Sequence, residues 1–457
     1  MPVDVPDSGE LVSLLVLVGI LVPLLCLIPV NAVVVLWGAV LPIYATSGVQ
    51  TQFFDAARVG CAVVVLLRTR PSGTTTGWRN ARSWLFLVGL LGCYVAVVGL
   101  LHGDTKTPTL GVSMVCSVLV AAVAARRAGL GGQILLGYAL GVCCSASVVL
   151  LQALDLPNPA RSMKFNGRLW GLGSNAPRVS LQLAIGCVLL LVRGLGAKPV
   201  IQLAAFSGMA VCFSALLAVG GREGIAALAC ALVVIMCQRL LRWWQLVTGA
   251  GVLAAAAVVI SAVGIEMTTI DRFSDPYMGS EPGSGDFTTG RAALLGESLT
   301  AFSRHWLFGI GTDQFQILYN YSGRFHGATT PHVAPLTFAV AAGIVGGAIA
   351  TYLFFRLAHL VFTSTTRPGD ARTATAGAVG AALLVSALLE PTGPFQGVEL
   401  TVLSVLAVTV LSERLAARGT PRGRSHRLPA VPVAGVQRAP MPSQALGERG
   451  TLLYPKR

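Results

Sequence analysis

The chain has 457 residues, of which 54% are hydrophobic and only 11% are charged, and its formal net charge at pH 7 is +14. Together with a mean hydropathy of +0.73, this composition excludes a water-soluble globular protein of ordinary type. Apolar runs of roughly 16–22 residues, long enough to cross a hydrocarbon core of about 30 Å, recur along nearly the whole length. The sequence therefore predicts a multi-pass membrane protein.

The expected spans are dominated by Leu, Val, Ala and Gly, which favours helices over a β-barrel. We expect an all-α, polytopic transmembrane fold of about 12–13 spans, with one long outer loop that contains short helices. In chain order the spans are expected near 11–28, 31–46, 53–67, 84–101, 109–125, 133–152, 179–193, 199–219, 224–238, 246–265, 333–356, 374–390 and 397–412.

Four parts of the chain follow from these spans. Transmembrane helices are expected in 1–265 and in 333–412, with a long extracytoplasmic loop at 266–332 between them. A disordered, basic cytoplasmic tail is expected at 413–457, because residues 412–457 hold nine Lys/Arg and only two Asp/Glu. Such a tail is most simply held near anionic headgroups, and binding to a cytoplasmic partner is the alternative.

Orientation is predicted from the loops in which Arg and Lys collect. The basic loops alternate along the chain, which assigns them to the cytoplasm and places 266–332 outside; they contain Arg68/Arg70/Arg79/Arg82, Arg126/Arg127, Arg193/Lys198, Arg239/Arg242 and Arg356/Arg367/Arg372. The N-terminus is then outside if 11–28 and 31–46 are two helices. It is inside if Pro23, Pro29 and Asn31 mark a break within one shared element, and both alternatives stay open.

All ten cysteines fall within expected spans. We interpret them as small apolar packing residues, without a role as disulfides or metal ligands. The acidic residues of the long loop show no metal-loop spacing and are expected to be solvated. Neither a metal nor another cofactor is therefore predicted.

Several cations lie on the predicted outer side, against the usual charge rule: Arg161, Lys164, Arg168, Arg178, Arg222, Arg291, Arg304 and Arg324. A single exposed Arg needs no functional explanation. Together, however, these side chains indicate a site for an anionic group carried by a lipid, because Arg binds phosphate oxygens bidentately and stays charged at any pH. A pyrophosphate is the natural candidate.

Three motifs surround these cations. The sequence GREG at 221–224 places Arg222 at the head of a helix, where free N–H groups and the helix dipole also favour an anion. The sequence GRAALLGESLTAFSRHWLFGIGTDQF begins at Gly290, and we expect its HWLFGIG part to be a helix end with a turn at Gly309 and Gly311. His332 directly precedes the next span, and His326 is the nearby rival.

This combination resembles the catalytic region of the O-antigen ligase and polymerase superfamily, closely over about 165–350. The resemblance implies a metal-independent, inverting membrane glycosyltransferase of cell-surface polysaccharide assembly. It would transfer a glycan from a polyprenyl, undecaprenyl-type, pyrophosphate carrier to a hydroxyl on a glycan, lipid or wall-polymer acceptor. The resemblance also implies a bacterial inner or plasma membrane location, an extracytoplasmic active site and no nucleic-acid partner.

Residue roles are implied by the same resemblance. Arg222 and Arg291 would bind the pyrophosphate, and His332 would be the catalytic base or would orient the acceptor hydroxyl. Possible further substrate-binding residues are Arg168, Arg304, Arg324 and His326. The chain departs from the family pattern where Gly221 replaces Ser, Trp306 replaces Pro and Val333 replaces Asn, and where FNGRLWGLGSNAPRVS at 165–180 changes the order of a Pro-Asn pair.

Two alternatives remain open at this point. A polysaccharide repeat-unit polymerase of the same superfamily would use the same carrier and differ in its acceptor. A lipid-linked glycan transporter or flippase would instead be expected to show internal repeats, broken helices and charges at mid-membrane. The sequence shows no convincing repeat.

Overall fold

The fold is known from a computed structural model. It describes residues 8–44, 49–69, 76–103, 106–126, 129–157, 169–173, 175–245, 251, 258, 291–311, 315, 331, 333–366, 370–389 and 397–419. Within these residues the secondary structure is helical and contains no strand, which confirms the all-α prediction.

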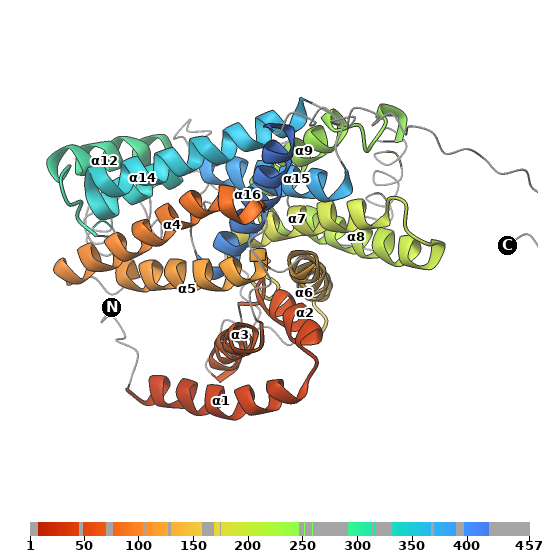
Figure 1. The fold of residues 1–457 in the computed structure, drawn as a ribbon, viewed down its shortest axis with the longest axis horizontal. Coiled ribbons are helices and arrows are strands. Elements are labelled where there is room, and N and C mark those ends of the chain that lie inside the picture. The colour runs from red at the N-terminus through yellow and green to blue at the C-terminus, as the bar shows by residue number, and fades with distance from the viewer. Residues whose placement is uncertain are drawn as a thin grey trace, which may run out of the picture. The chain divides into compact units, whose positions relative to one another are not determined.

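The helices follow the expected order along the chain (Figure 1). They are α1 (Ser8–Leu27), α2 (Val30–Val40), α3 (Val49–Arg68), α4 (Thr76–Leu101), α5 (Lys106–Arg126), α6 (Leu130–Ala153), α7 (Ala176–Gly194), α8 (Pro199–Val219), α9 (Arg222–Cys237), α12 (Arg291–Arg304), α14 (Ala334–Thr365), α15 (Ala371–Leu389) and α16 (Gly397–Gly419).

Six of these helices are long and apolar enough to cross a membrane: Ala81–Leu101 within α4, then α6, α7, α8, α14 and α15. Shorter apolar stretches lie in α1, α2 and α5. The protein is therefore a polytopic membrane protein, as predicted. The expected span at 246–265 lies outside the described residues except for 251 and 258, and so does the tail beyond Gly419.

The first two helices are separate elements, which was one of the two alternatives for the N-terminal region. Pro29 is the N-cap of α2, directly after the end of α1. Arg68 at the end of α3 donates through Nη1 to the carbonyl oxygens of Cys26 and Ile28. Under the alternating-loop prediction, two helices here place the chain start on the same side as 266–332.

The helices pack closely where small residues allow their backbones to meet. Gly137 and Gly141 of α6 lie one turn apart, and a Cβ on either would overlap the backbone of α2. This small-xxx-small spacing is a usual way for membrane helices to approach each other. Trp37, Trp84 and Tyr138 lie fully buried in the same core.

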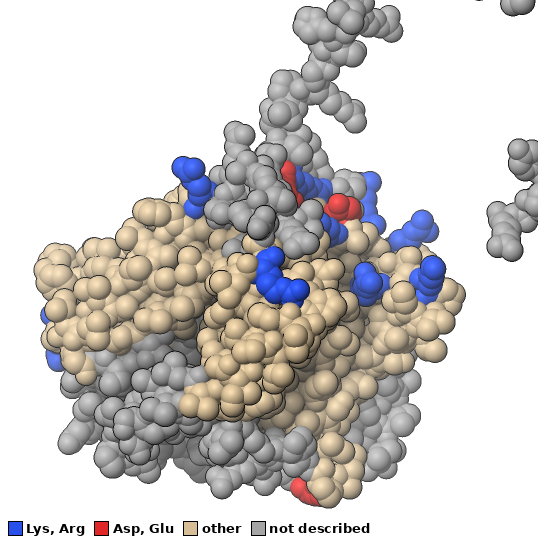
Figure 2. Space-filling view, turned by 60° about the horizontal axis from the view of Figure 1, so that its bottom comes forward, with Lys and Arg blue, Asp and Glu red and all other residues tan. Residues whose placement is uncertain are grey.

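Helix contacts define two ends of the bundle. Gln238 after α9 donates to Ser364 Oγ of α14 at 3.2 Å, so α9 and α14 end close together. The starts of α7, α9 and α16 meet through the contacts of Ser180 with Glu223 and of Arg178 with Glu399. We call the end where α7, α9, α14 and α16 begin the site end, and the other the far end. The far end holds Arg193, Lys198, Arg239, Arg242, Arg372 and Arg414. On the face drawn in Figure 2, the visible basic side chains gather mainly in the upper and right-hand part.

Candidate functional site

The tight turn between α8 and α9 presents Arg222 at the site end. Gly220 ends α8 with a φ of 80°, and Gly221 is the N-cap of α9 without a side-chain cap. A Cβ on Gly221 would lie 2.5 Å from Cβ of Ser180 on α7, so no side chain fits there. This contact explains why glycine replaces serine at this position of the pattern.

Arg222 is the first residue of α9 and is partly exposed. Its neighbour Glu223 is only 7% exposed, and Glu223 Oε1 lies 3.3 Å from Ser180 Oγ. Among the described residues no ion pair joins Arg222 to Glu223. The carboxylate of Glu223 therefore packs toward α7, and Arg222 lies in the first turn of α9, the kind of position where an anion is favoured.

A buried ion pair lies close to this turn. Arg178, two residues before Ser180, contacts Glu399 of α16 with 3.1 Å between Nη2 and Oε2, and the Glu399 side chain has no solvent exposure. Tyr138 Oη donates to Glu399 Oε1 at 2.6 Å, and Gln182 Nε2 donates to Oε2 at 3.0 Å. A carboxylate in such a place needs this number of donors, because an isolated buried charge is very costly.

Tyr44 extends this network toward α3. Its hydroxyl accepts from Arg178 Nη2 at 2.6 Å, and its ring lies 4.2 Å from the guanidinium carbons of both Arg178 and Arg58. Cation–π contacts of this kind are strongest when desolvated. The sequence grouped Arg178 with the predicted outer cations. In the structure, its charge is paired with Glu399 inside the helix bundle.

The start of α7 is capped locally. Asn175 Oδ1 accepts from the Arg178 amide at 2.8 Å, and Pro177 lies in the first turn. These are preferred residues for an N-cap and for the helix positions that follow it. The altered order Ser-Asn-Ala-Pro is thus explained by helix capping. The preceding segment 169–173 is anchored on α6, since Gly171 N donates to Gln152 Oε1 at 2.9 Å.

The long loop contributes the helix α12, which confirms the expectation of a short helix there. Arg291 is its first residue and Arg304 lies exposed in its last turn. Leu294 of α12 is buried in a small cluster with Ile310, Phe315 and Val340. Through this cluster α12 docks on the first part of α14.

The most unusual backbone of the site end is a break in α14. Ala342 has φ −133° and ψ 18°, and Gly343 has φ 69° and ψ −165°, a combination that is essentially restricted to glycine. The expected span 333–356 is thus two helical pieces, and its second piece extends to Thr365. The break leaves backbone groups of α14 without their usual partners in the helix.

The HWLFGIG segment fills this break with its own backbone. Ile310 N donates to Val340 O at 2.9 Å, Gly311 N donates to Ala341 O at 3.1 Å, and Ile344 N donates to Trp306 O at 2.7 Å. Gly309 and Gly311 have φ values of 71° and 74°, which confirms the predicted turn. The segment therefore supplies the hydrogen bonds that a membrane interior does not.

His102, at the end of α4, is a contact that the sequence did not suggest. Its Nε2 lies 3.3 Å from the carbonyl oxygen of Phe308. This places the C-terminal end of α4 against the HWLFGIG segment. A histidine immediately after an apolar span was the only signal in the sequence.

The predicted site residues are described to different extents. Arg222 and Arg304 are described with their side chains, and Arg291 is placed by the backbone of α12. Arg168, Arg324, His326 and His332 lie outside the described residues. The two neighbours of His332 are described: Pro331 O accepts from Thr337 Oγ1 at 2.9 Å, and Val333 is the N-cap of α14.

The sequence reasoning missed Glu399, Tyr138, Gln182 and Tyr44. Glu399 gave a usable signal, because an acidic residue in an expected span needs a buried partner. The ten cysteines are all free in the structure. Among the described residues, no group of three or more His, Cys, Asp or Glu side chains is arranged to hold a metal.

Comparison with known proteins identifies the region that contains this site. Residues 207–351 match the family described as O-Antigen ligase. The match extends from α8 through the long loop to the middle of α14, and it includes Arg222, Arg291 and the broken helix. No curated protein matches the chain.

Proposed function

From the O-antigen ligase domain that this chain carries at 207–351, we propose that it transfers a glycan from a polyprenyl pyrophosphate carrier to an acceptor hydroxyl. The domain belongs to a family of ligase-type and polymerase-type membrane glycosyltransferases. Ligation of a finished glycan is the function that we favour, with repeat-unit polymerisation as the alternative. The carrier is proposed to be of the undecaprenyl type, and the location to be the bacterial inner or plasma membrane.

The observation that best supports the proposal is the position of Arg222 within the matched domain. Arg222 is the first residue of α9, where its guanidinium and the helix start can both offer donors, and Glu223 Oε1 accepts from Ser180 Oγ. These donors favour a doubly charged phosphate group. Arg291, at the start of α12, is proposed as the second pyrophosphate ligand. Arg168, Arg304, Arg324 and His326 are proposed as further substrate contacts.

The proposed chemistry requires little from the protein beyond binding and positioning. Polyprenyl pyrophosphate is already an activated leaving group, so the arginines need only stabilise the charge that develops as it departs. His332 would remove the proton of the acceptor hydroxyl or orient that hydroxyl, and imidazole has a suitable ordinary pKa of about 6.5. Attack opposite the leaving group inverts the anomeric centre, without a metal.

The site end is proposed to face the outside of the cell membrane. The far end carries the basic side chains that the positive-inside rule assigns to the cytoplasm. The loop 266–332 would then be an extracytoplasmic catalytic loop, and its α12 packs against the first part of α14.

Transport remains the contrasting hypothesis, because a broken helix and a buried ion pair also occur in transporters. Here both features are hydrogen-bonded internally and lie at one end of the bundle. The test is an assay of purified protein with a polyprenyl-pyrophosphate glycan and an acceptor. Transfer releases free polyprenyl pyrophosphate and glycosylates the acceptor. Movement of the intact lipid-linked glycan without release would refute the proposal.

A single defined repeat unit as acceptor separates the two enzymatic alternatives. A polymerase extends a carrier-linked repeat unit into a ladder of products. A ligase leaves that unit unextended and transfers the donor glycan to a terminal acceptor that is not carrier-linked.

A further inference from the structure

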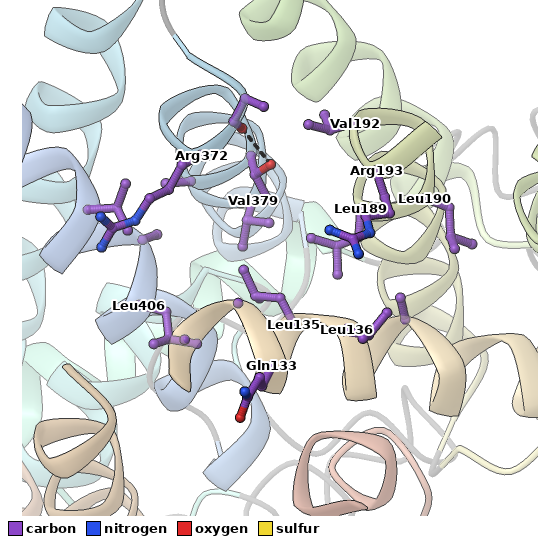
Figure 3. A pocket seen from close by; sticks show the side chains of 18 of the residues that line it. Gln133, Leu135, Leu136, Leu189, Leu190, Val192, Arg193, Arg372, Val379 and Leu406 are labelled. Carbon is purple, nitrogen blue, oxygen red and sulfur yellow. Dashed lines mark hydrogen bonds between the residues drawn. The ribbon is translucent and has the colours of Figure 1, made fainter. Parts of the chain in front are cut away.

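A cavity lies at the far end, away from Arg222. Its volume is about 780 Å³, and α6, α7, α15 and α16 surround it (Figure 3). This is within the range of about 300–1,000 Å³ in which proteins hold small molecules. Because its lining residues come from the end of α7, the start of α15 and the end of α16, the cavity is separate from the proposed glycan-transfer site.

The walls of this cavity are mainly apolar, although Gln133 of α6 is also among the lining residues. Leu135 of α6, Leu189 of α7, Val379 of α15 and Leu406 of α16 face it from four sides. Two threonines also line the cavity, but the hydroxyl of each already donates a hydrogen bond to a backbone carbonyl. Thr375 donates to Ala371 O and Thr409 donates to Val405 O, each at 2.8 Å, within their own helices. The walls are therefore suited to a hydrocarbon chain.

The rim of the cavity is cationic. Arg193 is exposed and extends from α7 toward the space between the helices, with Arg372 on the opposite side (Figure 3). Arg372 is paired with Glu413 at 2.9 Å, whereas the described residues offer Arg193 no ion-pair partner. Within the described part of the chain, one positive charge is thus without an ion-pair partner at the mouth of a largely apolar space.

We propose that this cavity binds an anionic glycerophospholipid, with an acyl chain between the apolar walls and the phosphate at Arg193. The surrounding bilayer supplies such molecules, and a guanidinium can hold two phosphate oxygens at once. A neutral detergent or sterol would leave the charge of Arg193 unused. The Arg-rich segment after Gly419 is a poor occupant, because its charge has the same sign as the rim. The inference does not depend on glycan transfer.

The test measures lipid retained by the full-length protein. Protein purified from nanodiscs of phosphatidylglycerol and phosphatidylcholine is analysed by native mass spectrometry. The wild-type chain should retain phosphatidylglycerol in preference to phosphatidylcholine. In Arg193→Gln the affinity for phosphatidylglycerol should fall about fivefold, the usual effect of one basic side chain near an anionic lipid surface.

Matched controls are available for both the charge and the cavity. Lys198→Gln removes a neighbouring far-end charge that does not line the cavity, and it should keep the lipid. Gly132→Leu should exclude the lipid by filling the space, because a Cβ there meets nothing within 4 Å. Gly89→Leu makes the same change in α4 with equally open surroundings and should keep the lipid.

Four results would overturn the inference. These are equal retention of phosphatidylcholine, an unchanged affinity in Arg193→Gln, an equal loss in Lys198→Gln, or displacement of phosphatidylglycerol by added polyprenyl phosphate. Gly132→Leu keeps the test decisive if Arg193→Gln is recovered poorly. Its binding is compared with that of Gly89→Leu at equal recovery of monodisperse protein.

Discussion

Arg178 and Glu399 are 221 positions apart in the sequence, and their side chains meet at the site end with 3.1 Å between Nη2 and Oε2. The pair joins the first turn of α7 to the first turn of α16. Ser180, two residues after Arg178, also lies near the start of α7. Its hydroxyl donates to Glu223, the residue that follows Arg222. The turn that carries the proposed pyrophosphate ligand Arg222 therefore packs, through Ser180, on the same helix start as this buried ion pair.

Removing the carboxylate should be strongly destabilising. Glu399→Ala leaves the guanidinium of Arg178 without its partner in a buried place, which typically costs about 3–5 kcal/mol. Chemical denaturation in detergent should show this loss. The control is Glu413→Ala, which breaks the ion pair with the exposed Arg372 and should cost about 0–1 kcal/mol. Similar losses in both variants would contradict the structural role of the pair.

Arg222 and Arg291 should not tolerate lysine. Lysine keeps the charge but loses the planar two-point contact with phosphate, and losing one transition-state donor commonly lowers the rate by about 10²–10³. We expect this loss of transfer rate in Arg222→Lys and in Arg291→Lys. Arg242→Lys, at the far end, should retain activity. Rates are measured at matched levels of folded protein, and normal transfer in both site variants would refute the pyrophosphate roles.

His332→Ala should affect turnover more than carrier binding. A base or orienting group acts on the acceptor hydroxyl in the transition state, so its removal lowers the transfer rate and leaves the affinity for the lipid carrier near normal. Arg222→Ala should instead weaken both quantities. Near-normal transfer in both His332→Ala and Arg291→Ala would defeat the proposed site. His326 and Arg324 would then be the next pair to test.

Gly343 should resist substitution even by alanine. Its backbone conformation is one that other residues adopt at a cost of about 1–3 kcal/mol, and a Cβ would overlap the backbone of Leu307. We expect Gly343→Ala to lower both thermal stability and transfer. Gly296→Ala in α12 is the matched control, because a Cβ there meets nothing within 4 Å and alanine favours a helix. A wild-type melting temperature for Gly343→Ala would argue against the break in α14.

Membrane orientation can be tested with single cysteine reporters at Ser284 and Ser425, in a background that lacks the native cysteines. Ser284 should react with an impermeant reagent in intact cells, because 266–332 is predicted outside. Ser425 should react only after permeabilisation. The reverse pattern would place the proposed site on the cytoplasmic side and exclude an outer-face transfer reaction.

Hydropathy was sufficient to predict the helical class and most helix positions, because each span is a local property of the chain. The turn at Gly309 and Gly311 was also predictable, since both glycines follow a short apolar run. The partners of Glu399 could not be predicted, because Tyr138 and Arg178 lie 261 and 221 positions away in the sequence. Local periodicity carries no information about such contacts. The break in α14 could not be predicted either, because its Ala-Ala-Gly stretch is also compatible with a continuous span.

The hydrogen bonds between the HWLFGIG segment and α14 have a consequence for protein engineering. The carbonyl oxygens of Val340 and Ala341 accept hydrogen bonds from the amides of Ile310 and Gly311. The loop segment and the helix therefore form one structural unit. These hydrogen bonds depend on the backbone geometry at Gly309, Gly311 and Gly343, so a chimera that takes the long loop from one relative and α14 from another should disturb them wherever the two sequences do not share those glycines. Loop exchanges designed to alter acceptor choice should therefore carry residues 305–344 across as a single block.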